Sequence, residues 1–461
     1  MTAWYNASIF YHMYPLGMTG VPRVNPFSWP SCSEKETNHT DSEPMKELFQ
    51  WIPHLERMNF TAVYIGPLFE SSTHGYDTRD YRLVDRRLGT NEDFKVFVQI
   101  CHRHGIQVVV DGVFNHTGRE FFAFRDIQEK GSSSPYTGWY KNLSFDWKSP
   151  LGDNFGYDAW RGIFELPCLN LQNTEVKEYL KDVIRFWVSE FDIDGIRLDC
   201  ANILDFQFMK ELRTLAGELK PDFWLMGEVI HGEYARWVND EMLHSVTNYE
   251  MHKSIYSAHN DHNYFELAHN VGRLIHVGRF LYTFLDNHDE DRIASKLCDE
   301  AHLMPIYTLL YTLPGIPSVY YGSEWGIKGL RDNTSDEALR PRILPMEAER
   351  MENSELSSHI CRLGKIHKEH EALHGGEYRE LLLTNRQYAF LRSSGQGDEI
   401  LTVANNDSNE ASINLRLPAG SSARELLTDR EFPIVQEMLS FNLPPNSAFV
   451  FSIDRDTPSF L

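Results

Sequence analysis

Four short segments of the sequence place a carboxylate at or directly after an apolar run. They are DGVFNHTG (111–118), GIRLDCAN (195–202), GEVIH (227–231) and FLDNHD (284–289). A single aspartate after a strand is more often a helix N-cap or a turn residue. Four such segments in succession instead indicate side chains that converge on one pocket. Because carboxylates are costly to bury together, such a pocket is typical of a catalytic site.

The carboxylates that we expect to converge are Asp199, Glu228 and Asp289. Glycoside hydrolysis needs paired carboxylates of this kind. One of them protonates the oxygen of the leaving sugar, while another meets the positive charge that develops at the anomeric carbon. These residues are therefore candidates for sugar chemistry.

The elements that must position these residues form a repeating pattern. Up to about residue 320, β-rich apolar runs alternate with helical periodicity, which is typical of parallel βαβ units. The predicted strands are 9–14, 61–66, 106–113, 192–198, 223–228, 244–248, 280–285 and 317–321. One predicted helix has Asn91 as its N-cap, and another covers 174–189. The fold predicted is α/β, a closed (β/α)8 TIM barrel, in which reactive groups lie at the C-terminal ends of the strands.

Two further units are expected beside the barrel. The segment 115–172 is rich in Gly, Ser, Asn and aromatics, shows no helical pattern and follows the third strand, which indicates an insertion subdomain over the barrel mouth. After a helix near 353–370, short alternating strands predict a C-terminal antiparallel β-sandwich. The barrel would then comprise 1–114 and 173–372, the insertion 115–172 and the sandwich 373–461.

Taken together, the four segments resemble the signature regions of the α-amylase family of glycoside hydrolases, in the order in which that family carries them. LPCLN (166–170) resembles the signature of the family's B domain, and HGYD (74–77) and GIPSVYYG (315–322) resemble its second and eighth strands. The resemblance runs from about residue 9 to residue 340. The run DCAN (199–202) is most similar to neopullulanases, cyclomaltodextrinases and related maltodextrin-degrading members.

The resemblance implies catalytic roles for three residues. Asp199 would be the nucleophile, held ionised and oriented by the guanidinium of Arg197. Glu228 would be the acid/base, with a raised pKa so that it is protonated when the leaving oxygen departs. Asp289 would bind sugar hydroxyls and favour the distorted ring of the transition state.

The resemblance also implies a set of substrate-binding residues. They are Tyr76, His74, His116, Arg197, His288, Asp336 and Arg340. His116, His288 and Tyr76 would line the subsite of the sugar under attack, with the tyrosine as a stacking platform. Asp336 and Arg340 match a pair that the family often places at the next subsite, although an exposed i, i+4 ion pair is an equal alternative for them.

By this resemblance we expect retaining hydrolysis of α-1,4-glucosidic bonds in maltooligosaccharides through a covalent glucosyl–enzyme intermediate, with α-1,6 bonds as an open second linkage. A 4-α-glucanotransferase is the first alternative, since a few side chains decide whether water or a sugar is the acceptor. A non-catalytic scaffold protein is a remote alternative, because Asp199, Glu228 and Asp289 are all present.

Composition excludes other classes of partner. A formal net charge of −22 repels polyanions, so nucleic acid is not an expected partner. The sequence has no apolar stretch long enough to span a membrane, and its first residues show no secretory signal. We therefore expect a cytoplasmic protein that binds α-gluco-oligosaccharides and leave its oligomeric state open.

No cofactor and no metal site are predicted. The cysteines Cys32, Cys101, Cys168, Cys200, Cys298 and Cys361 are far apart and are expected to be free thiols. HNDH (259–262) has two histidines three apart, but without a third ligand nearby a solvated turn is favoured over zinc. Many members of the family bind calcium where the insertion joins the barrel, but the Lys-His pair that accompanies that site is absent after Asp199. Calcium stays an open alternative.

Overall fold

The computed structural model describes residues 3–28, 43–332, 335–351, 354–417 and 421–455. At its centre is a sheet of eight parallel strands in the order β8-β7-β6-β5-β2-β1-β10-β9. These strands are β1 Phe10–Met13, β2 Ala62–Ile65, β5 Gln107–Gly112, β6 Gly195–Leu198, β7 Trp224–Gly227, β8 Ser245–Val246, β9 Tyr282–Phe284 and β10 Ile316–Tyr320. A parallel bridge between Thr247 and Tyr282 joins the two ends of the sheet and closes it into a barrel.

The barrel confirms the predicted fold class and each of its eight predicted strands. The strands are apolar on both faces because one face fills the barrel and the other packs on helices. Phe10 and Tyr64 belong to the interior cluster, and their neighbours Tyr11 and Val63 belong to the outer one. The strands of the sheet can therefore be short and still be fully buried.

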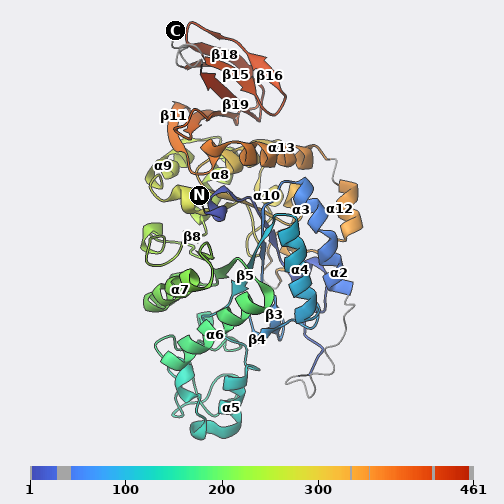
Figure 1. Cartoon of the computed structure of the whole chain (residues 1–461), viewed down its shortest axis with the longest axis vertical. Coiled ribbons are helices and arrows are strands. Elements are labelled where there is room, and N and C mark those ends of the chain that lie inside the picture. Colours follow the sequence, from blue (N-terminus) through green and yellow to red (C-terminus); the bar gives the residue numbers. More distant parts are fainter. Residues whose placement is uncertain (1–2, 29–42, 333–334, 352–353, 418–420, 456–461) are drawn as a thin grey trace.

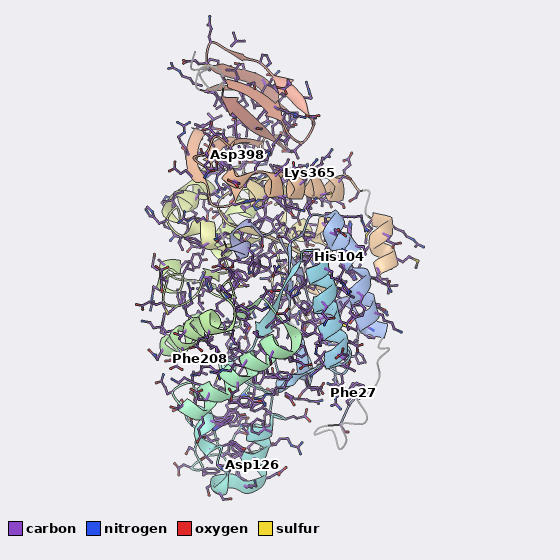
Figure 2. All side chains as sticks on the ribbon, in the orientation of Figure 1. Phe27, His104, Asp126, Phe208, Lys365 and Asp398 are labelled. Carbon is purple, nitrogen blue, oxygen red and sulfur yellow. The ribbon has the colours of Figure 1, made fainter. Side chains whose placement is uncertain are left out.

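Helices cover the outside of the barrel. They are α1 Pro15–Met18, α2 Glu43–Gln50, α3 Ile52–Arg57, α4 Asn91–Arg103, α6 Thr174–Phe191, α7 Phe206–Leu219, α8 Tyr249–Asn260, α9 Phe265–Arg273, α10 Ile293–Lys296, α11 Leu303–Thr312, α12 Pro345–Met351 and α13 Glu355–Glu369. One further helix, α5 Phe122–Lys130, lies in the insertion subdomain. Phe208 on α7, labelled in Figure 2, is fully buried and lies against Phe114 after β5. In the described part of the chain, none of these helices combines the length and apolar character needed to cross a bilayer.

The N-cap of α4 differs from the prediction by one residue. Asn91 is already helical, and the cap is Thr90, whose side chain accepts the Asp93 N–H while the Asp93 side chain accepts the Thr90 N–H. This reciprocal pair is a capping box, which satisfies two backbone donors that the first turn leaves open. The predicted cap at Asn91 is therefore wrong.

The insertion subdomain leaves the barrel after β5 and returns at α6. Figure 1 shows it at the opposite end of the molecule from the C-terminal sheets. Isolated antiparallel bridges such as His116–Cys168 tie its loops together. The expectation that this segment has no helix is wrong, because α5 buries Ala123, Phe124 and Ile127 as one short apolar face. A hairpin of β3 Phe69–Ser71 and β4 Thr78–Val84 extends from β2 in addition.

Two antiparallel sheets follow α13 and confirm the predicted sandwich. Their strands are β11 Glu377–Leu383, β12 Gln387–Ser393, β13 Glu399–Asn405, β14 Ala411–Arg416, β15 Ser421–Glu425, β16 Arg430–Phe432, β17 Ile434–Val435, β18 Met438–Leu443 and β19 Ser447–Arg455. One sheet has the order β11-β12-β13-β19-β15-β16 and the other β14-β18-β17. Leu401, Leu439 and Phe451 belong to the core shared between them. The residue bounds predicted for the three units stay predictions.

Candidate active site

Strands β5, β6 and β7 bring three buried carboxylates around one guanidinium. Arg197 donates from Nη1 to Asp111 Oδ1 at 2.9 Å and to Asp199 Oδ1 at 2.8 Å. Its Nη2 lies 3.0 Å from Glu228 Oε2. The Arg197 side chain is only 3% exposed, so water screens these charge-assisted contacts weakly. The predicted residues Arg197, Asp199 and Glu228 therefore meet at the C-terminal end of the barrel.

Asp199 and Glu228 lie close enough to act on the same atom. One carboxylate oxygen of each lies within 4.8 Å of the other. In retaining glycosidases the two carboxyl groups are about 5 to 5.5 Å apart, whereas inverting enzymes need about 6.5 to 9.5 Å to leave room for a water. The closest oxygens of this pair therefore lie nearer to each other than the separation that inverting enzymes need.

Glu228 occupies an environment that favours its protonated form. Burial raises the pKa of Glu228, and the nearby charges of Asp199 and Asp289 raise it further against the opposing charge of Arg197. The Cys200 N–H donates to Glu228 Oε2 at 3.0 Å. Cys200 adopts a left-handed φ of 51°, which is uncommon for a residue with a Cβ. This turn directs a backbone donor at Glu228.

Asp289 is held in place by two neighbouring side chains. Arg340 donates from Nη2 to Asp289 Oδ1 at 2.8 Å, and His288 Nε2 lies 3.2 Å from the other carboxylate oxygen. Burial alone would raise the pKa of Asp289, but His288 and Arg340 outweigh it and hold the pKa below its usual value. The Asp289 N–H also donates to Asn287 Oδ1 at 2.9 Å. Asp289 is therefore ionised and fixed in orientation.

Three stacked rings stand beside Asp289. The His288 ring is nearly parallel to both Tyr14 and Tyr76, with centroids 5.7 Å and 5.6 Å away. The Tyr76 hydroxyl lies 2.5 Å from His288 Nε2 and 3.3 Å from Asp111 Oδ2. Burial raises the pKa of Tyr76, so its hydroxyl keeps a proton to donate. Tyr76 and His288 are therefore brought to the carboxylates as expected, and Tyr14 is an addition that the sequence did not indicate.

His116 lies where the insertion leaves the barrel and pairs with Cys168 in an isolated bridge. It is 2% exposed, burial lowers its pKa, and Asn115 Nδ2 lies 3.1 Å from its Nδ1. The Trp160 ring lies 5.7 Å from the His116 ring, and Trp160 Nε1 donates to Cys200 Sγ at 3.1 Å. Sequence reasoning missed Trp160, whose only signal was an aromatic residue in an insertion expected over the barrel mouth.

The remaining predicted substrate-binding residues are Asp336, Arg340 and His74. Arg340 contacts Asp336 Oδ2 at 3.2 Å, and its Nε also donates to the His288 carbonyl at 3.0 Å. The side chain of Arg340 is 14% exposed, so this is not a solitary surface ion pair. The His74 side chain is 44% exposed, and its Nδ1 accepts the Tyr76 N–H at 3.2 Å.

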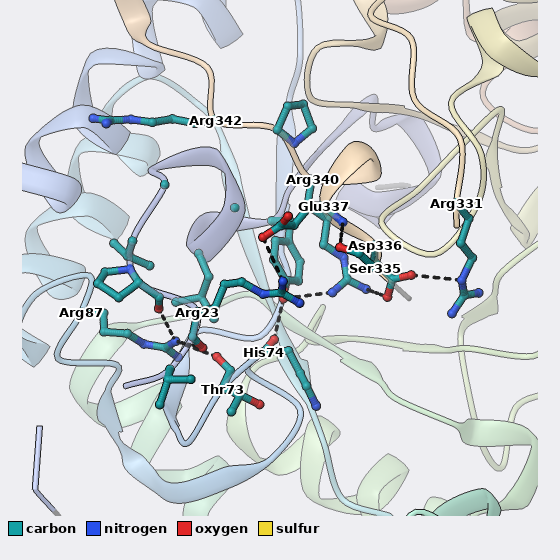
Figure 3. Close-up of a pocket in the computed structure, with 18 of the residues that line it drawn as sticks. Arg23, Thr73, His74, Arg87, Arg331, Ser335, Asp336, Glu337, Arg340 and Arg342 are labelled. Atoms are coloured by element: carbon teal, nitrogen blue, oxygen red, sulfur yellow. Dashed lines mark hydrogen bonds and ion pairs between the residues drawn. The ribbon is translucent and has the colours of Figure 1, made fainter. Parts of the chain in front are cut away.

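A cavity of about 1260 Å³ adjoins the site (Figure 3). Tyr14, His74 and Arg340 form its inner wall, next to the rings and carboxylates described above. Its outer walls are formed by residues of the segments 17–24 and 331–342. The site is therefore continuous with a space larger than the roughly 300 to 1,000 Å³ of an ordinary small-molecule pocket.

One group of side chains in the described part of the chain could hold a metal ion: Asp199, Cys200 and Glu228. Arg197 already contacts both of these carboxylates, so a cation would compete with the guanidinium. Burial raises the pKa of Cys200, which disfavours the thiolate that a metal would bind. The expectation of no metal stays a prediction.

The HNDH motif lies away from this site. Its predicted solvated turn is wrong for His259, which is fully buried at the end of α8 with Nδ1 2.9 Å from His302 Nδ1. Asp261 in the same motif is exposed. A third histidine is thus near, but it forms a buried polar contact rather than a surface ligand set.

Cysteine pairing agrees with the sequence expectation where the structure describes it. Cys101, Cys168, Cys200, Cys298 and Cys361 are free. Cys32 lies outside the described residues.

Two protein-family models match this chain. Residues 33–360 match the family model for the alpha amylase catalytic domain, and residues 378–450 match that for the maltogenic amylase C-terminal domain. The cyclomaltodextrinase of Geobacillus thermopakistaniensis is 30% identical over 470 residues, covering 98% of this chain and 78% of that protein. The intracellular maltogenic amylase of Bacillus subtilis is 28% identical over 413 residues, covering 87% of this chain and 68% of that protein. The acarbose-soaked crystal structure of the Nostoc punctiforme debranching enzyme has a TM-score of 0.81 at 27% identity, covering 97% of this chain and 98% of that one.

Proposed function

Because the chain belongs to the α-amylase family of glycoside hydrolases, we propose that it hydrolyses α-1,4-glucosidic bonds in maltodextrins with retention of configuration. The observation that carries this proposal is the approach of Asp199 and Glu228 to within 4.8 Å, beneath a shared guanidinium. The names of the similar proteins, a cyclomaltodextrinase and a maltogenic amylase, support maltodextrins as the substrate class.

In the first step Asp199 attacks the anomeric carbon and Glu228 gives its proton to the leaving oxygen. Arg197 donates to Asp199 and orients it for attack, and the raised pKa of Glu228 favours the protonated acid before the bond breaks. In the second step Glu228, now a carboxylate, takes a proton from water, which attacks the glucosyl–Asp199 ester and restores the α configuration. These two carboxylates supply nucleophile and proton, so the proposed reaction requires no cofactor.

Asp289 and the rings around it would bind the sugar under attack. Its ionised carboxylate accepts hydrogen bonds from sugar hydroxyls and stabilises the positive charge of the transition state. His116 and His288 would line the same subsite, and the Tyr76 ring, which stacks on His288, offers an apolar face to the sugar. We propose that one glucose ring binds between Asp199 and Asp289.

We propose two finer points in addition. Cleavage of α-1,6 bonds is a second candidate activity, which the similarity to a debranching enzyme over nearly the whole chain favours. A cytoplasmic location is supported by the similarity to a protein named as intracellular.

The test is to incubate the protein with maltotriose, maltoheptaose, β-cyclodextrin and pullulan and to follow the products and their anomeric configuration by NMR. We expect α-configured glucose or maltose, and a loss of activity on the order of 10³-fold or more in Asp199→Asn. Asp182→Asn, at a surface ion pair on α6, is the matched control and should keep full activity. β-configured products would refute retention, longer oligomers alone would indicate a transferase, and no turnover of any α-glucan would refute the proposal.

A further inference from the structure

The cavity beside the active site lies on the side of the retained sugar. In the proposed reaction Glu228 protonates the leaving sugar, which must therefore lie next to Glu228. The inner wall of the cavity instead contacts Asp289, through Arg340 Nη2 at 2.8 Å. Tyr14, on the same wall, stacks on His288. The non-reducing part of the substrate, which stays on the enzyme, therefore extends into this cavity.

The size and charge of the cavity suit a neutral oligosaccharide. At about 1260 Å³ it has room for more than one sugar. The arginines on its wall are paired with carboxylates, as Arg331 is with Asp336 and Arg342 with Glu47. Paired charges of this kind offer donors and acceptors to hydroxyl groups but little net positive charge to an anion.

A further ion pair joins two walls of the cavity. Arg23 Nη1 lies 3.0 Å from Glu337 Oε1 and so joins the segments 17–24 and 331–342 (Figure 3). The two side chains are 68% and 66% exposed, compared with 14% for Arg340, which places the pair at the outer rim. Glu337 begins the short 3₁₀ turn Glu337–Leu339, and the Arg340 N–H donates to its carbonyl at 3.0 Å.

We propose that the Arg23–Glu337 ion pair is a clasp that determines how many glucose units the enzyme retains ahead of the cleaved bond. The inference rests on the proposed function. A retained segment that fits behind the clasp binds without disturbing it, whereas a longer one must displace it. Because an ion pair this exposed is weak, the clasp biases the position of cleavage and does not block long chains.

The test maps the bonds cleaved in maltoheptaose that is labelled at its reducing end. The variants are Arg23→Ala, Glu337→Ala, the double alanine variant and the charge reversal Arg23→Glu with Glu337→Arg. In each single variant we expect the ratio of retained segments of three or more glucose units to maltose to rise about two- to fivefold. In the double alanine variant this ratio should rise no further, because each single variant already breaks the ion pair. The charge reversal should return the ratio toward that of the unmodified protein.

A matched control removes an exposed ion pair elsewhere. Arg416 lies 2.8 Å from Glu437 on the C-terminal sheets, and Arg416→Ala should leave the cleavage pattern unchanged. An unchanged pattern in both single variants, or a charge reversal that behaves like them, would overturn the clasp while leaving the proposed function standing. Absence of turnover in the unmodified protein would instead overturn the proposed function itself.

Discussion

Arg197 sets the charge balance of the active site, because Asp111, Asp199 and Glu228 share its guanidinium. One positive charge does not compensate three buried carboxylates, so the site favours binding a proton. Burial and the charge of Asp199 raise the pKa of both Asp111 and Glu228 despite the opposing effect of Arg197. The arrangement provides the proton that an acid/base needs, and its cost is a less stable fold.

We therefore predict that Glu228→Gln stabilises the fold by about 1 kcal/mol while it abolishes hydrolysis. The folded pKa of Glu228 is raised above its unfolded value, so the ionised group destabilises the protein once the pH exceeds that unfolded value. The gain in Tm should thus be largest near neutral pH and shrink toward pH 4.5. Scanning calorimetry between these limits measures it, with Glu165→Gln at an exposed position as control. A variant less stable than the unmodified protein at pH 7 would contradict this account.

At the scale of elements, a buried arginine joins the barrel helices to the C-terminal sheets. Arg392 on β12 is fully buried and donates to the Thr312 carbonyl at 2.8 Å and to the Gly376 carbonyl at 3.2 Å. Thr312 ends α11, where the unpaired carbonyls of a helix carry partial negative charge. Burial lowers the pKa of Arg392 to about 10, so it remains charged at neutral pH.

Replacing Arg392 by Met should remove this connection. The side chain keeps most of its apolar length, but the Thr312 and Gly376 carbonyls lose a charged donor, which we expect to cost about 2 kcal/mol of unfolding free energy. Urea unfolding measures the loss, and Arg416→Met at an exposed position serves as the control. Equal stability of Arg392→Met and the unmodified protein would show that the contact contributes nothing.

Across the whole molecule, many histidines are buried in their neutral form. Burial lowers the pKa of His12, His116, His244, His252, His259, His302, His359, His367 and His374. They come from the barrel, the surrounding helices and the insertion junction alike. A group whose folded pKa is depressed binds more protons in the unfolded state, so acidification favours unfolding.

We predict that the protein loses stability as the pH falls from 7 through 6.5 to 5, before most carboxylates begin to titrate. Each buried histidine adds at most about 1.4 kcal/mol per pH unit to the slope. His259→Gln should therefore make the fall in Tm shallower, whereas His269→Gln, at an exposed position, should not. A Tm that stays constant over this range would contradict the prediction.

More of the fold than of the active site could be predicted from the sequence. The strands and the carboxylates at their ends follow from hydrophobic periodicity, which is a local property of the chain. Local pattern failed where the signal was short: the apolar face of α5 spans only Ala123 to Ile127, and the cap of α4 depends on the backbone angles of Thr90. The predicted residues Tyr76 and His288 do contact carboxylates, and His116 is buried beside Trp160, but these contacts could not be foreseen.

The sequence by itself thus determined the barrel, its order of strands and the residues that could carry the chemistry. Only the tertiary structure decided which side chains meet. Trp160 and Cys200 are 40 residues apart in the chain, and His259 and His302 are 43 apart. The physical reason is that a contact of about 3 Å depends on barrel closure and on how separate loops pack against each other, and no local period in the sequence encodes either.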